Sequence, residues 1–127
     1  MTRHVLTVNL KNDPSAIAAY RDHHRHVWPE VLASLRKVGV EQLDIHMLGR
    51  RLVMIVEMTD GLDFRRAFAA HMSSNPRVAE WERLMKSLQE RSPYAADDEW
   101  WAVMEPVFRL EDQEPAIAQA VDRLRTS

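Results

Sequence analysis

The chain has 127 residues, a formal net charge of −2, 46% hydrophobic and 28% charged residues, and no cysteine. This composition indicates one globular domain, and the small net charge argues against a nucleic acid or an anionic membrane as partner. The lack of cysteine excludes disulfides and thiolate metal sites, and with an N-terminus that has no signal-peptide core it predicts a cytoplasmic protein.

The N-terminal part of the chain predicts a strand followed by a helix. Residues 4–10 alternate between apolar and polar side chains, which is typical of a strand. Asp13 and Pro14 form a helix start, because a capping carboxylate precedes a proline at the first helical position. The helix is expected to kink or restart at Pro29 and to end at Gly39.

A hairpin is predicted next. Residues 40–48 and 51–59 are expected to form its strands, joined at Gly49. The run Leu52–Val56 is apolar on both faces, so we expect a central strand that is covered on both sides.

The second half of the chain predicts two more helical segments and a last strand. The helices are expected over residues 62–72 and 75–90. The last strand is expected from Ala102 to Leu110, at a sheet edge because Pro106 lies within it.

The predicted order of elements is β-α-β-β-α-β, which is the ferredoxin-like arrangement of the α+β class. Helices cover only one face of such a sheet. A second copy of the chain is the simplest cover for the other face, and this predicts a homodimer. The alternative is a monomer whose long loop and tail cover that face.

The end of the chain is expected to be a separate addition. We place a ferredoxin-like domain at residues 1–111 and a helical appendage at residues 112–127, where Glu114 and Pro115 begin a pattern of helical spacing. The alternative is a frayed tail.

One helical stripe carries the residues best suited to chemistry. Tyr20, His24 and Trp28 are four residues apart, so they point in nearly the same direction. Imidazole serves as acid or base near neutral pH, and the proline break next to this stripe opens space beside it. We therefore take His24 as the candidate catalytic residue and Tyr20 as a candidate binding residue.

A metal site or cofactor site is not expected. His23 and His24 diverge by about 100° on a helix, and only Asp22 and His26 share a face, which is too few ligands. With three glycines in all, the chain has no phosphate-binding loop.

Other residues have both a structural and a functional interpretation. Trp81 fits a core position or a stacking platform for a sugar ring, and Glu82 fits a solvated charge or a group at the pocket rim. Trp100 and Trp101 suit a pocket wall or a dimer interface equally well. His46 is either a surface histidine or a second proton carrier.

At these residues the chain resembles the L-rhamnose mutarotase family. The likeness covers residues 3–110, and its most specific part is the first-helix pattern Tyr-x-x-x-His-x-x-x-Trp-Pro-Glu, residues 20–30. The resemblance implies a dimeric α/β barrel of ferredoxin-like subunits that interconverts the anomers of a 6-deoxy sugar without a cofactor. It also implies that His24 is the catalytic proton donor and that Tyr20 and Trp81 contact the sugar.

Two residues depart from the pattern of the family. Glu82 stands where the second of two paired tryptophans is expected, and Leu43 stands where a binding tyrosine is expected. Some relatives are associated with L-fucose, and a new carboxylate changes which hydroxyl groups are recognised. The sequence therefore favours L-fucose slightly over L-rhamnose.

The chemistry predicted from the sequence is general acid–base opening and reclosure of the pyranose ring. The acid is assigned to His24, and the base is left open between Glu82, His46 and a water held by Tyr20. Two other classes compete: a monooxygenase of the same barrel type, free of cofactor or haem-dependent, and a non-catalytic domain that binds a small ligand.

Overall fold

Three long strands form the centre of the molecule in the computed structural model, which describes residues 1–126. They are β1 (Thr2–Leu10), β2 (Val40–Leu48) and β3 (Arg51–Met58). All pairings are antiparallel, in the order β2-β3-β1-β4, with β5 also pairing with β1. The short strands are β4 (Gln89–Glu90) and β5 (Ala102–Val103). The apolar run of β3 lies between β1 and β2, which confirms its predicted central position.

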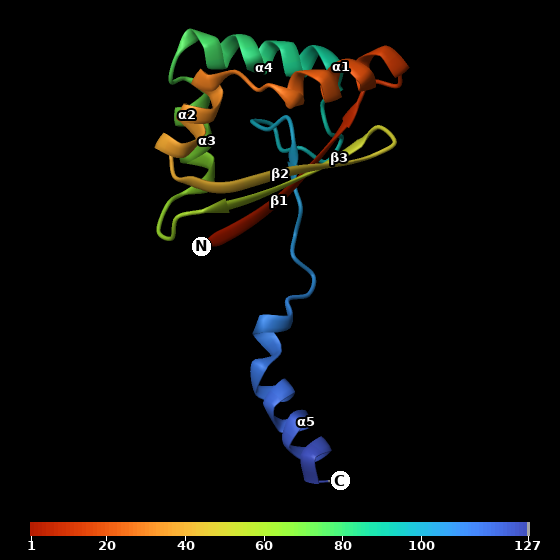
Figure 1. Ribbon diagram of the computed structural model, residues 1–127, viewed down its shortest axis with the longest axis vertical. Coiled ribbons are helices and arrows are strands. Elements are labelled where there is room, and N and C mark those ends of the chain that lie inside the picture. Colours follow the sequence, from red (N-terminus) through yellow and green to blue (C-terminus); the bar gives the residue numbers. More distant parts are fainter. Residues whose placement is uncertain (127) are drawn as a thin grey trace.

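Four helices cover one face of this sheet (Figure 1). They are α1 (Pro14–Arg25), α2 (Pro29–Lys37), α3 (Phe64–Met72) and α4 (Pro76–Leu88). The predicted β-α-β-β-α-β order and the ferredoxin-like α+β class are confirmed, with each helical region divided into two helices.

Local capping explains where these helices begin. Asp13 Oδ1 accepts a hydrogen bond from Ser15 N at 2.9 Å, and Asn75 Oδ1 accepts one from Val78 N at 3.1 Å. A proline follows each cap, where its missing N–H costs nothing. The predicted restart at Pro29 is confirmed, since α1 ends at Arg25 and α2 begins at that proline.

The predicted last strand is wrong beyond its first two residues. Met104 N donates to Val5 O at 2.7 Å, and the sheet pairing ends there. Residues 104–109 have no strand beside them among the residues that the structure describes, and Val107 is 96% exposed. Apolar residues promote a strand only where a neighbouring strand offers hydrogen bonds, and Pro106 removes one donor as well. The predicted helix end at Glu90 is also wrong, because Gln89 and Glu90 form β4.

The C-terminal segment stands apart from the sheet and its helices (Figure 1). It consists of η1 (Leu110–Gln113) and α5 (Glu114–Thr126), and none of their residues is buried. The helix begins where Glu114 and Pro115 predicted it, whereas Ser127, the predicted end of the appendage, lies outside the described residues. Within residues 1–126, no helix is long and apolar enough to cross a membrane.

The face of the sheet opposite the four helices carries no helix from residues 1–126 (Figure 1). Val53 and Ile55 of β3 point to this side, and both remain partly exposed. The predicted cover on the second side of β3 is therefore not supplied by the described residues.

Candidate functional site

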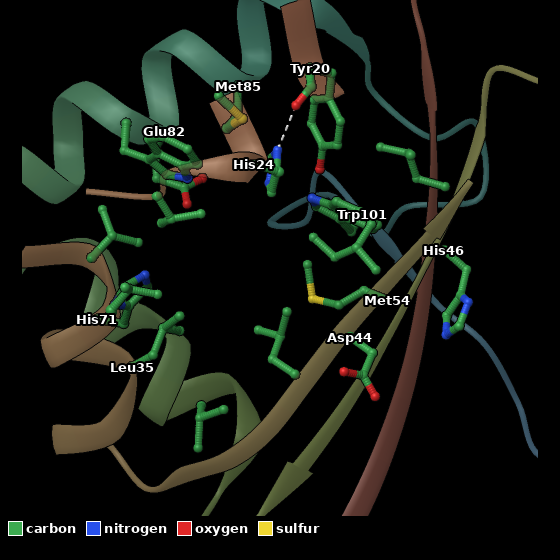
Figure 2. A pocket seen from close by; sticks show the side chains of 18 of the residues that line it. Tyr20, His24, Leu35, Asp44, His46, Met54, His71, Glu82, Met85 and Trp101 are labelled. Atoms are coloured by element: carbon green, nitrogen blue, oxygen red, sulfur yellow. Dashed lines mark hydrogen bonds between the residues drawn. The ribbon is translucent and has the colours of Figure 1, made fainter. Parts of the chain in front are cut away.

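A cavity of about 1050 Å³ lies between the sheet and the helices (Figure 2). Just over half of its lining residues are apolar, and the others are polar or charged. The apolar lining includes Val27, Val31, Leu35, Ile45, Met54 and Met85. A large apolar cavity with a few polar groups is the usual form of a small-molecule site.

The helix break places the polar groups of α1 in this cavity. Tyr20 and His24 both line it, and their ring centroids are 4.2 Å apart. His24 Nδ1 lies 2.8 Å from the Tyr20 carbonyl oxygen, as the dashed line in Figure 2 shows. A carbonyl oxygen only accepts, so Nδ1 carries the proton and donates it. Nε2 of His24 is therefore the ring nitrogen left for exchange with a ligand.

Burial sets the charge state of this imidazole. It lowers the pKa of His24 below the usual value of 6.5, and the hydrogen bond to Tyr20 O opposes part of this shift. The ring is therefore neutral at neutral pH, with a lone pair on Nε2. In this state it accepts a proton before it donates one.

Aromatic rings surround His24. Trp81 meets His24 edge-on with ring centroids 5.4 Å apart, and it meets Trp28 at 5.2 Å. The Arg77 guanidinium lies 3.8 Å from the centroid of the Trp28 ring. Trp28 contacts Trp81 but is not among the described residues that line the cavity, unlike Tyr20 and His24 of the same predicted stripe. Trp81 is 5% exposed and belongs to the core, yet it also lines the cavity, so its two interpretations are compatible.

Glu82 also lines the cavity rather than lying on a solvated helix face. Burial raises the pKa of its carboxyl group, and the positive charge of Lys86 opposes this shift. No hydrogen bond or ion pair to Glu82 occurs among the residues that the structure describes, so the carboxyl group is available to a ligand.

Gln89 is a polar residue of the site that the sequence analysis missed. Its side chain is 3% exposed, and its Oε1 accepts a hydrogen bond from Trp100 Nε1 at 2.9 Å. The same side chain hydrogen-bonds the phenol of Tyr20, whose pKa is nevertheless raised, mainly by burial. Helical spacing gives no signal for this residue, because α4 ends at Leu88 and Gln89 lies in β4.

His46 lies away from this cluster. Its side chain is exposed on β2, on the same face of the strand as Gln42 and Asp44. Figure 2 shows its ring on the far side of the strand from His24, although it borders the cavity at the sheet edge. We therefore do not assign the role of second proton carrier to His46. Leu43, on the opposite face of β2, does line the cavity, as does Trp101.

The histidine-rich end of α1 holds no metal cluster. Asp22 forms an ion pair with Arg25 at 3.0 Å. No group of three or more histidine, cysteine, aspartate or glutamate side chains in residues 1–126 is placed to hold a metal ion.

Comparison with known proteins gives this site its class. The family model for L-rhamnose mutarotase matches residues 3–110. The chain belongs to the L-rhamnose mutarotase family. It is therefore a mutarotase, an isomerase that interconverts sugar anomers, and residues 111–126 lie outside the match.

A relative of high coverage supports this assignment, and solved structures support the fold. The chain is 39% identical over 115 residues to an L-fucose mutarotase from Xanthomonas campestris pv. campestris, covering 88% of this chain and 90% of that protein. The crystal structure of an L-rhamnose mutarotase from Formosa agariphila matches with a TM-score of 0.62 at 20% identity, covering 86% of this chain and 98% of that one. An antibiotic biosynthesis monooxygenase matches with a TM-score of 0.51 at 18% identity, covering 85% of this chain and all (100%) of that one. At such identities the structural likeness shows the fold alone and does not favour the monooxygenase alternative.

Proposed function

We propose that this mutarotase acts on a 6-deoxy-L-hexose, with L-fucose as the first candidate and L-rhamnose as the second. The relative of 39% identity is an L-fucose mutarotase, and it matches over most of both chains. A cavity that is lined by both apolar and hydrogen-bonding side chains suits a sugar that carries a methyl group in place of one hydroxymethyl group. Glu82 adds a carboxyl group to this cavity, where it is able to accept or donate a hydrogen bond to a sugar hydroxyl.

The proposed reaction begins with the neutral His24. Its Nε2 takes the proton of the anomeric hydroxyl group, and the electron pair left on O1 forms the C1=O1 double bond. The C1–O5 bond then breaks, and O5 takes a proton from the carboxyl group of Glu82. This produces the open aldehyde, an imidazolium and a carboxylate.

Rotation about the C1–C2 bond presents the other face of the aldehyde to O5. On reclosure the Glu82 carboxylate takes the proton of the O5 hydroxyl group while O5 attacks C1, and His24 returns its proton to O1. His24 thus acts as base in opening and as the expected proton donor in closure. Both groups regain their starting states, so no cofactor is consumed.

Tyr20 has a binding role in this proposal. Trp100 Nε1 donates to Gln89 Oε1, which leaves the amide N–H₂ of Gln89 to face the phenol. The phenol oxygen then accepts from Gln89, and its own proton is free for a sugar oxygen. Trp81 supplies a flat apolar surface beside it.

The observation that carries the proposal is the fixed orientation of His24, with Nδ1 bonded to a carbonyl in a cavity wall and Nε2 unpaired. Saturation-transfer NMR between the α- and β-anomer signals of L-fucose and L-rhamnose tests it. We expect exchange well above the spontaneous rate for at least one of the two sugars, and the faster one identifies the substrate. No acceleration of either sugar by the folded protein would refute the proposal.

We also propose that two copies of the chain pair through the open face of the sheet to form a dimeric α/β barrel. The partly exposed Val53 and Ile55 and the exposed Val107 and Phe108 support this, because such apolar surface is stabilised by a partner.

We further propose that residues 1–111 form the mutarotase domain and that residues 112–127 form an appendage. A cytoplasmic location, suggested by the cysteine-free sequence, is tested by cell fractionation.

A further inference from the structure

His71, near the end of α3, is an imidazole of the cavity wall that the mechanism does not use. Its side chain is 3% exposed, and it lines the cavity. Figure 2 shows it across the cavity from Tyr20 and Trp101, next to Leu35. The sequence analysis missed it, although its spacing from Phe64 and Phe68 places it on the inner stripe of α3.

A closed chain of hydrogen bonds holds this ring. His71 Nδ1 lies 2.8 Å from Ser34 Oγ on α2, and Ser34 Oγ lies 2.9 Å from Ser74 Oγ. Ser74 Oγ in turn donates to the backbone carbonyl of His71 at 2.7 Å. The chain joins α2 to the end of α3, and Ser34 itself is buried.

The direction of every bond in this chain follows from the carbonyl at its end. Since a carbonyl oxygen only accepts, the Ser74 hydroxyl must donate its proton to the carbonyl of His71. The Ser34 hydroxyl must then donate to Ser74, and its oxygen is left to accept from His71. His71 therefore carries its proton on Nδ1, and Nε2 has a free lone pair.

This lone pair opens onto the cavity. Over residues 1–126, His4 Nε2 is the one fully buried side-chain nitrogen or oxygen that has no hydrogen-bond partner. His71 Nε2 also makes no hydrogen bond to a described residue, so it is not sealed within the protein, and the space that its side chain borders is the cavity. A fixed acceptor beside the apolar side chain of Leu35 suits a hydroxyl donor of the ligand.

We propose that His71 is a specificity-determining residue whose Nε2 accepts a hydrogen bond from a sugar hydroxyl group at the edge of the ring remote from C1. This inference rests on the proposed function, in which His24 and Glu82 hold the C1–O5 side. The hydroxyl groups on C3 and C4 lie across the ring from C1. L-Fucose and L-rhamnose differ in configuration at C2 and C4. An acceptor at this edge therefore distinguishes the two sugars by the direction of the C4 hydroxyl group.

The test compares L-fucose with its 3-deoxy and 4-deoxy analogues in the wild-type protein and in His71→Asn. The asparagine amide nitrogen replaces Nδ1 and keeps the bond to Ser34, but no atom replaces Nε2. We expect the wild type to prefer L-fucose over one analogue by roughly two- to tenfold in kcat/KM, and His71→Asn to lose that preference. His26→Asn, the same change at an exposed position on the end of α1, is the matched control and keeps it.

Two further measurements keep the inference testable if His71→Asn folds poorly. Ser34→Ala leaves the cavity surface intact but removes the hydrogen bond that fixes the tautomer of His71. We expect this variant to show a weaker preference for L-fucose over the deoxy analogue. Long-range ¹H–¹⁵N NMR of the wild type reports the tautomer directly. Protonated Nδ1 and unprotonated Nε2, with an Nε2 signal that shifts when the sugar is added, support the inference.

The possible failures are distinguishable. A wild-type protein that exchanges no 6-deoxy sugar refutes the proposed function. Normal exchange with an unchanged preference in both variants, or a His71 ring protonated on Nε2, overturns the role of His71 alone.

Discussion

Replacement of His24 by asparagine separates proton transfer from the structural contribution of the imidazole. The asparagine side-chain amide keeps a donor where Nδ1 stands, so the bond to the Tyr20 carbonyl at 2.8 Å is retained. Nε2 is removed, and with it the proposed base. General acid–base help is typically worth on the order of 10²–10⁴-fold, which corresponds to about 3–5 kcal/mol of activation free energy.

The cost to folding is expected to be much smaller than this. The variant loses part of the edge contact with Trp81, at 5.4 Å, but leaves no new unpaired donor. We therefore expect destabilisation of about 1 kcal/mol, typical of a point substitution, and a protein that remains folded. Activity should fall by two orders of magnitude or more while the urea midpoint moves little.

The assay is anomer exchange measured by saturation transfer, with the spontaneous rate subtracted and with folding checked by circular dichroism. His26→Asn serves again as the matched control, and we expect it to keep the wild-type rate. A folded His24→Asn protein that exchanges anomers within tenfold of the wild type would show that Nε2 is not the proton carrier.

Three other changes test separate parts of the molecule. Glu82→Gln keeps the size of the side chain but cannot transfer a proton, so kcat should fall on the order of 10²-fold; an unchanged kcat would exclude Glu82 as the acid. Gln89→Leu leaves an indole N–H and a phenol unpaired. Urea unfolding should therefore show a loss of about 1–3 kcal/mol of unfolding free energy, and anomer-exchange kinetics should show a raised KM for the sugar. Ile55→Arg should halve the mass seen by light scattering, whereas an unchanged mass would place the dimer contact elsewhere. Because burial lowers the pKa of His24 and of His71, the unfolded chain binds more protons at these two histidines just below pH 6.5. In the Glu82→Gln variant, where the raised pKa of Glu82 no longer acts in the opposite direction, the unfolding free energy should therefore fall as pH drops through this window.

Local signals explain which parts of the fold were predictable. The Asp-Pro and Asn-Pro pairs set the starts of α1 and α4 through their caps, and Pro29 divides the first helical region because it lacks a donor. The apolar run of β3 required a central strand. Each of these effects acts within a few residues, so the sequence alone reveals it.

The last strand and the inner polar chain depend on long-range packing instead. Residues 104–109 have the composition of a strand, but whether they form one depends on a neighbour that this chain does not supply. Ser34 and His71 are 37 positions apart and meet only because α2 and α3 pack together. No spacing rule pairs residues so distant, which is why the tautomer of His71 was not predictable.

The same kind of contact has different consequences for the two imidazoles of the cavity. Both donate through Nδ1 and present Nε2 to the ligand, and burial lowers the pKa of each. For His24, the carbonyl of Tyr20 opposes that shift and stabilises the imidazolium that forms when a proton arrives. For His71, burial alone acts, and its partner is a neutral hydroxyl group. The charged state is therefore better supported at His24, which suits proton transfer, whereas His71 remains neutral and suits the recognition of a hydroxyl group.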